Sequence, residues 1–206
     1  MNTTSKSEAT YATILDAAVD MAATEGIGRL SLGEISKRTG ISKSGVFSRV
    51  GSLEALQAAV LDEYDRRFSD EVFLPALASP RGLPRLSAMV NLWLKKIAGE
   101  TARGSCLYTA GAFEFDDIPM PHPLRERVEA GVVRWRASMR KAVLQAMEVG
   151  HLRPDTEPEQ LVFEIYSLVI GVMHDARFLR DEGAPRRAQR AFNRLISTYR
   201  SFSDLE

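Results

Sequence analysis

The chain reads LSLGEISKRTGISKSGVFSRVGSLEAL over residues 30–56, and this stretch decides the fold of its N-terminal part. Ser31, with a glutamate three residues later, forms a capping box that predicts the start of a short helix, and Gly40 predicts its end. Ser42 predicts the N-cap of a second helix, which runs to about Val50. Two short helices joined by a tight glycine turn are typical of a helix-turn-helix, whose second helix enters the DNA major groove.

The residue types around this turn fit that interpretation. Gly40 tolerates the left-handed backbone of a sharp reversal, and apolar residues such as Ile35 and Val46 predict a fixed angle between the two helices. Small hydroxyl side chains, free helix N–H groups and cations suit contact with phosphates and base edges. We therefore expect DNA contacts from Ser31, Lys37, Ser42, Lys43, Ser44, Gly45, Phe47, Ser48 and Arg49.

Several of these residues have a second interpretation. Lys37 is a solvated charge as readily as a phosphate contact. Arg49 reaches either DNA or Glu54, and Phe47 either faces DNA or packs on the following helix. Position favours DNA contact most clearly for Lys43 and for the serines beside it, because they lie at the start of the second helix.

Outward from this stretch, the rest of the chain also shows helical periodicity and almost no strand signal. We expect an all-α protein with about nine helices, in which residues 1–52 form a three-helix DNA-binding domain and residues 53–206 a helical ligand-sensing and dimerisation domain. A Pro- and Gly-rich linker is expected at 78–84. The expected helices cover roughly 7–24, 31–40, 42–50, 52–74, 86–100, 106–115, 124–148, 159–180 and 185–199.

Composition bounds the remaining possibilities. Lys plus Arg (27) equals Asp plus Glu (27), so any DNA contact depends on local placement and not on bulk charge. The single cysteine, Cys106, forms no internal disulfide, and no Cys/His spacing predicts a metal site. Acidic residues interrupt the N-terminal apolar positions, which argues against a signal peptide or membrane anchor. We expect a cytoplasmic protein without cofactor or metal.

The stretch 30–56, together with the preceding ILDAA at 14–18 and the EGIG turn at 25–28, resembles the DNA-binding domain of the TetR family. This resemblance implies a homodimeric regulator, most often a repressor, that binds a palindromic operator and is released by a small ligand. Three positions depart from the family pattern. Phe47 stands where the family usually has Tyr, Val50 where it often has an aromatic residue, and Leu53 where it often has Lys.

The C-terminal region is similar to TetR-type sensor domains, which implies a four-helix dimer interface built from the last two helices of each subunit. Their apolar positions predict that interface at Leu161, Ile165, Leu168, Val172, Ala188, Ala191 and Leu195. A mostly apolar effector site with few polar groups is expected among the preceding helices. Its candidate residues are Trp93, Tyr108, Phe113, Tyr166, Met173 and His174.

Two alternatives from other classes remain open at this point. One is a helical ligand-binding module with weakened DNA binding, which the departures at Phe47, Val50 and Leu53 favour. The other is a helical-bundle enzyme that uses Cys106, although no nucleophile motif or phosphate loop accompanies that thiol. No catalytic residue is expected, and the acidic Glu114 is interpreted as part of a solvated helix end.

Overall fold

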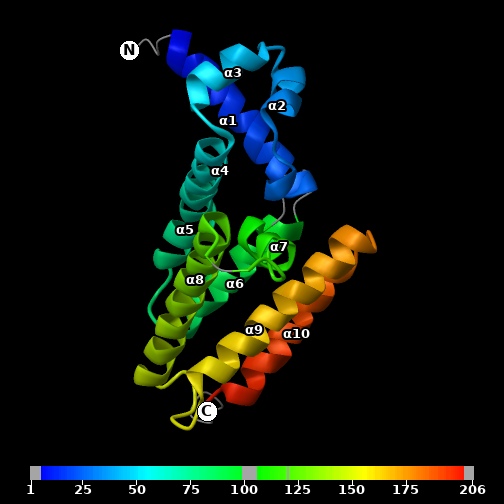
Figure 1. The fold of residues 1–206 in the computed structure, drawn as a ribbon. Helices are drawn as coiled ribbons and strands as arrows, with labels where there is room; N and C mark the ends of the chain where they lie inside the picture. Colours follow the sequence, from blue (N-terminus) through cyan, green and yellow to red (C-terminus); the bar gives the residue numbers. More distant parts are fainter. Residues whose placement is uncertain (1–5, 99–105, 120, 202–206) are drawn as a thin grey trace. The chain divides into compact units, whose positions relative to one another are not determined.

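The computed structural model describes residues 6–98, 106–119 and 121–201, which fold almost entirely into helices (Figure 1). The only extended pairing in this part of the chain is an isolated bridge between Leu152 and Arg200. The helices are α1 Lys6–Glu25, α2 Leu32–Thr39, α3 Lys43–Val50, α4 Leu53–Phe68, α5 Leu74–Leu77, α6 Leu83–Ala98, α7 Leu107–Glu114, α8 Pro123–Glu148, α9 Pro158–Met173 and α10 Ala184–Tyr199. Three short helical turns join them, η1 Ile27–Arg29, η2 Ser69–Phe73 and η3 His174–Phe178.

Two expected helix boundaries are wrong. The fourth helix does not end before Pro75, because η2 is a π-helical turn that places this proline in the first turn of α5, where a missing N–H is tolerated. Because the backbone stays helical from α4 through η2 into α5, the described chain still forms the nine helical segments expected. The expected linker 78–84 is shorter, since α6 already begins at Leu83. The expected end of α6 at residue 100 lies outside the described residues.

The described chain forms two compact units. Unit 1 contains residues 6–67 and 106–130, and unit 2 contains residues 68–98 and 131–201. Compactness thus groups the chain differently from the expected division at residue 52, because α4, α7 and the start of α8 belong to the same unit as the helix-turn-helix. The expected division concerns function and stays a prediction.

The core of unit 1 joins α1 to the two short helices. Ile14, Ile35, Val46 and Leu56 come from four different helices, and each is fully buried. Such interior packing is needed, because helices as short as α2 and α3 are not stable on their own. At the rim, Arg67 on α4 bridges Glu63 to Asp16 of α1, with 2.5 Å between Arg67 Nη2 and Asp16 Oδ1. Hydrogen bonds from Arg66, the largest cause, and from Arg67 lower the pKa of Glu63 to about 2.

A carboxylate clamp holds η1 within unit 1. Glu114, the last residue of α7, accepts hydrogen bonds from the backbone N–H of Ile27 at 3.1 Å and of Gly28 at 2.7 Å. A Cβ on Gly28 would lie 2.5 Å from a Glu114 oxygen, so a larger residue there would displace the carboxylate from this position. From the other side, Gln57 of α4 donates to the Ile27 carbonyl at 3.4 Å. The turn that joins α1 to α2 is therefore tied to both α4 and α7.

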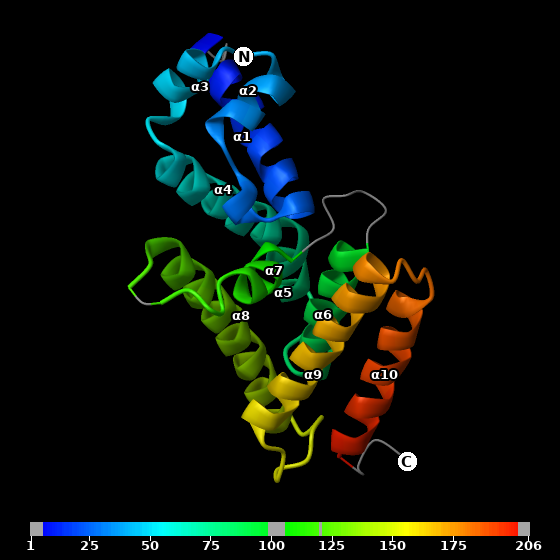
Figure 2. The same ribbon diagram turned by 45° about the vertical axis from the view of Figure 1, so that its right-hand side comes forward.

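Unit 2 is built around α6, α9 and α10, and the last two run side by side in Figures 1 and 2. Trp93 of α6 is fully buried at its centre and meets Trp135 of α8 edge-on, with ring centroids 5.5 Å apart. The loop after α8 closes the unit, because His151 Nδ1 accepts from the Leu83 N–H at 3.1 Å and so caps α6. The Arg153 N–H donates to the Tyr199 carbonyl at 2.9 Å, which ties down the end of α10.

Two glycines of the helix-turn-helix should respond to alanine with opposite signs. Gly40 has φ of 70°, in the left-handed region, so Gly40→Ala should lower the free energy of unfolding by about 1 kcal/mol. Gly33 lies within α2 with open space around its Cα, so Gly33→Ala should raise it by about 0.5 kcal/mol. Urea unfolding followed by circular dichroism measures both, and equal effects would contradict the proposed turn geometry.

Removing the Glu114 carboxylate that holds η1 should lower the free energy of unfolding. A carboxylate at a helix C-terminus is unfavourable by itself, so without its hydrogen bonds Glu114→Gln would be neutral or stabilising. We expect instead a loss of about 1 kcal/mol in the free energy of unfolding, because one acceptor is removed. Faster hydrogen exchange at Ile27 and Gly28 should accompany it. Asp116→Asn, which changes a nearby exposed charge, serves as the control and should leave both quantities unchanged.

Candidate functional site

The orientation of α3 is set by the turn that precedes it. Gly40 ends α2 with its N–H bonded to the Ser36 carbonyl, and the Ser36 hydroxyl donates to the Ile41 carbonyl at 2.6 Å. Ser42 then caps α3, because its hydroxyl oxygen accepts from the Gly45 N–H at 3.1 Å. Side-chain hydrogen bonds thus satisfy backbone groups on both sides of a reversal only three residues long, from Gly40 to Ser42.

One face of α3 carries most of the residues expected to contact DNA. Val46 points inward and is fully buried, whereas Lys43, Ser44, Ser48 and Arg49 are exposed. Phe47 is exposed over 56% of its surface, although it is a large apolar residue. Packing on α4 therefore covers less than half of this side chain.

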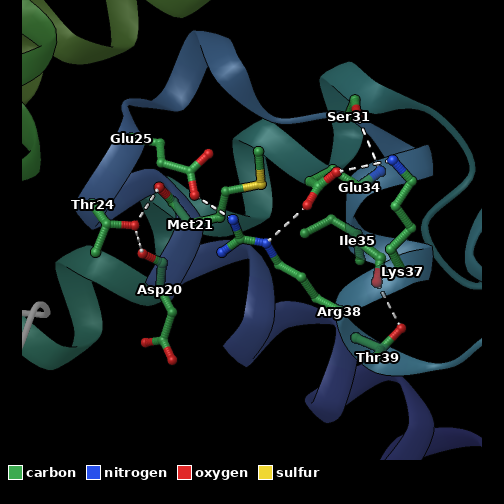
Figure 3. A network of polar contacts seen from close by, with 10 residues as sticks. All are labelled: Asp20, Met21, Thr24, Glu25, Ser31, Glu34, Ile35, Lys37, Arg38 and Thr39. Carbon is green, nitrogen blue, oxygen red and sulfur yellow. Dashed lines mark hydrogen bonds and ion pairs between the residues drawn. The ribbon is translucent and has the colours of Figure 1, made fainter.

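Unlike the exposed face of α3, α2 carries charges that form ion pairs. Arg38 pairs with Glu25 at the end of α1, and its Nε lies 3.5 Å from Glu34 Oε1 (Figure 3). The hydrogen bond to Glu25 is the largest cause that raises the pKa of Arg38. Lys37 lies 3.5 Å from another oxygen of Glu34 and stays 79% exposed. Arg38 thus braces α2 against α1, whereas Lys37 remains open to solvent.

The two charged ends of α3 contrast with this network. Among the described residues, no carboxylate forms an ion pair with Lys43 or Arg49, so the pairing considered between Arg49 and Glu54 is not formed. Ser31 uses its hydroxyl oxygen to accept from the Glu34 N–H at 3.1 Å. The Glu34 carboxylate itself turns to Lys37 and Arg38. Of the cations on α2 and α3, those without a described ion-pair partner therefore lie on α3.

The expected effector residues of unit 2 fall into two groups. Trp93 and Tyr166 meet with ring centroids 5.4 Å apart, and Arg136 lies 5.2 Å from the centre of the Tyr166 ring. The buried indole N–H groups of Trp93 and Trp135 have no hydrogen-bond partner within the described residues. By contrast, His174 is exposed and pairs with Asp175 at 2.9 Å in η3, just beyond the half-buried Met173.

The other expected effector residues lie in unit 1. Tyr108 is buried edge-on against Tyr64, with ring centroids 5.4 Å apart, whereas Phe113 is 59% exposed. Cys106 is buried and accepts a hydrogen bond from the Thr109 hydroxyl at 3.1 Å. Burial is also the main reason that the pKa of Tyr64 is raised well above its usual value.

The expected dimer residues also separate by burial. Leu161, Ile165, Val172 and Ala188 are already buried within the single chain, so they pack unit 2 and have little surface left for a partner. The lining residues of an outward groove along α9, η3 and α10 include Val172 and Ala188 of this set. The groove is lined by Ser167, Leu168, Gly171, Val172, Asp175, Ala184, Arg187, Ala188, Arg190, Ala191 and Arg194.

Two features of the site escaped the sequence analysis. Glu114 was interpreted as part of a solvated helix end, yet it clamps η1, and the glycines at 26 and 28 are the only sequence signal of that close approach. The outward face of α9 was also missed. Phe163, Ser167 and Gly171 recur every four residues and are all exposed, which is the spacing of one helix face.

The described residues offer neither a group of metal ligands nor a helix suited to cross a membrane. No cluster of three or more His, Cys, Asp or Glu side chains there has the arrangement of a metal site. None of the described helices combines the length and the apolar character that crossing a bilayer requires.

Two family models match the chain, one in its N-terminal part and one in the larger part that follows. The family model "Bacterial regulatory proteins, tetR family" matches residues 14–60, which contain the helix-turn-helix. The model "Tetracyclin repressor-like, C-terminal domain" matches residues 82–192, more than half of the chain. No curated protein matches the sequence.

Solved structures show the same fold at low sequence identity. A TetR transcriptional regulator from Chloroflexus aurantiacus is 24% identical, with a TM-score of 0.82 over 95% of this chain and 98% of that one. A TetR-family regulator from Agrobacterium tumefaciens is 17% identical, with a TM-score of 0.81 over 95% and 100%. AibR, in complex with isovaleryl coenzyme A and operator DNA, is 16% identical, with a TM-score of 0.67 over 92% and 97%.

The two family models thus agree with the all-helical fold and with the geometry of the N-terminal helix pair. The chain belongs to the TetR family of bacterial transcriptional regulators.

Proposed function

We propose that this protein is a cytoplasmic repressor that binds a palindromic operator as a homodimer and leaves it when a small, largely apolar effector binds. The observation that carries the proposal is the exposed face of α3. There, Lys43 lies beside small hydroxyl side chains and has no described ion-pair partner, whereas the nearby Arg38 is neutralised by Glu25 and Glu34. The exposed Arg49, near the end of the helix, has no described ion-pair partner either.

The position of each residue on α3 determines which part of the DNA it would contact. Lys43 and the first N–H groups of α3 suit phosphate contacts, because a helix N-terminus attracts anions. Ser44 and Ser48 project next to them, where base edges would lie once the helix enters the major groove. Lys37 and Arg49 are exposed cations at the flanks and suit more distant phosphates.

The outward groove between α9 and α10 supports the homodimer. Gly171 is exposed, and a Cβ built on it would meet no atom within 4 Å, so a second helix can approach closely there. Leu168, Ala191 and Leu195 keep part of their surface and lie on the two helices that border this groove. We therefore assign the main dimer contact to these three side chains, whereas Leu161 and Ile165 pack within the single chain.

The cluster around Trp93 supports an effector site in unit 2. Two unpaired indole N–H donors in an aromatic setting favour a mostly apolar molecule that carries an acceptor oxygen, because a buried donor without a partner is costly. Tyr166 and the Arg136 guanidinium stacked on it add a polar edge. The similar structure of AibR was solved with both an acyl coenzyme A and operator DNA bound to that protein.

The experiment that tests the proposal is selection of bound sequences from a random DNA pool by the purified protein. We expect one palindromic motif, whose half-sites repeat at the spacing of the two α3 helices in the dimer. If the folded, dimeric protein enriches no sequence even at low salt, the repressor proposal is wrong and a ligand-binding module with weakened DNA binding is favoured.

Removing Lys43 should weaken binding through phosphate contact. Lys43→Ala should raise the Kd for the selected operator about tenfold at 100 mM salt and lower the slope of log K against log salt by about 2, because a dimer loses two contacts. Fluorescence anisotropy with labelled operator measures both. Lys141→Ala, on the exposed face of α8, removes the same charge elsewhere and should change neither quantity. Equal effects of the two variants would contradict the assignment.

Filling the space beside Gly171 should separate the dimer without unfolding the chain. Gly171→Arg places a long charged side chain where a partner helix would approach, while the single chain has room for it. Light scattering should give the parent protein about twice the 22.9 kDa mass of the chain and the variant the monomer mass. The control, Ala137→Arg on exposed α8, should stay dimeric. A parent protein that is monomeric at micromolar concentration would contradict the homodimer.

A further inference from the structure

Phe47 is the one large apolar side chain on a polar face. Successive residues of an α-helix are about 100° apart, so residues 43, 44, 47 and 48 share one side of α3 and Val46 faces the opposite side. Phe47 and Ser44 occupy the centre of that side, and Lys43 and Ser48 its edges. With 56% of its surface exposed, Phe47 presents a ring that water solvates poorly.

The polar neighbours of this ring reach less far than it does. The Ser48 hydroxyl donates back to the Gly45 carbonyl at 3.0 Å, within the same turn of helix. The Ser44 oxygen lies 3.3 Å from the Ser42 oxygen, close to the helix N-terminus. The side chain that projects furthest from the centre of the exposed face is therefore apolar.

The major groove offers one apolar group to such a side chain. Base edges there present hydrogen-bond donors and acceptors, and the exception is the C5-methyl group of thymine. Resting on the proposed function, in which α3 enters the major groove, we propose that Phe47 reads a thymine methyl group in each operator half-site. Phe47 thereby acts as a specificity-determining residue through the apolar ring itself, which needs no hydroxyl.

Deoxyuridine tests this directly, because it differs from thymidine only by the missing methyl group. Each thymine of the selected operator is replaced in turn, symmetrically in both half-sites, and the Kd is measured by anisotropy. Burial of one methyl group changes affinity by about fourfold, so one symmetric pair of replacements should raise the Kd of the parent protein by about tenfold or more. The other positions should change it less than twofold.

Two variants assign that effect to Phe47. Phe47→Ala, an exposed substitution whose folding is checked by circular dichroism, should bind thymine and deoxyuridine operators equally at the sensitive position. Lys43→Ala should bind both more weakly and keep the full ratio between them. The proposal is overturned if no deoxyuridine position weakens the parent protein, if the half-site contains no thymine, or if Phe47→Ala keeps the same ratio.

These results separate the inference from the function on which it rests. A random pool that yields no motif overturns both the repressor and the methyl contact. A clear palindromic motif whose affinity is insensitive to every thymine methyl leaves the repressor intact and overturns the role of Phe47 alone.

Discussion

The reversal between α2 and α3 is the constraint on which the rest of the helix-turn-helix depends. It spans only three residues, and it holds because Gly40 accepts a left-handed backbone while Ser36 and Ser42 satisfy the backbone groups on either side. Neither helix is long enough to be stable alone, so the buried pair Ile35 and Val46 sets their angle. Because this packing buries the side of α3 that carries Val46, the opposite side of the helix stays exposed.

The positive charge available to DNA is then local to α3. The chain as a whole carries equal numbers of basic and acidic residues, 27 of each, so attraction to DNA has to be local. Glu25 and Glu34 neutralise Arg38 and use it to brace α2, while Lys43 and Arg49 keep their charge at the two ends of α3. The Glu114 clamp ties the same unit together from α7, because it holds the turn between α1 and α2.

The sequence predicted the features that depend on local chemistry. The caps at Ser31 and Ser42 and the turn at Gly40 follow from neighbouring residues, and the structure confirms them. The fourth helix was predicted to end before Pro75. The π-helical turn η2 keeps the backbone helical up to this proline, and a single sequence does not show such a turn. Helical spacing also does not tell which apolar positions are covered within the single chain. Leu161 and Ile165 are fully buried there, and their part in the dimer contact stays a prediction. The role of Glu114 depends on a contact 86 residues away along the sequence from Gly28.

The central claim is that two copies of α3 read two half-sites at once, and a change in half-site spacing tests it most directly. One helical turn of DNA is about 10 base pairs, so inserting about 5 base pairs at the centre of the selected operator turns one half-site to the opposite side of the duplex. The account predicts that affinity then falls to that of a single half-site. Unchanged affinity after this insertion would contradict a rigid dimer that reads a palindrome.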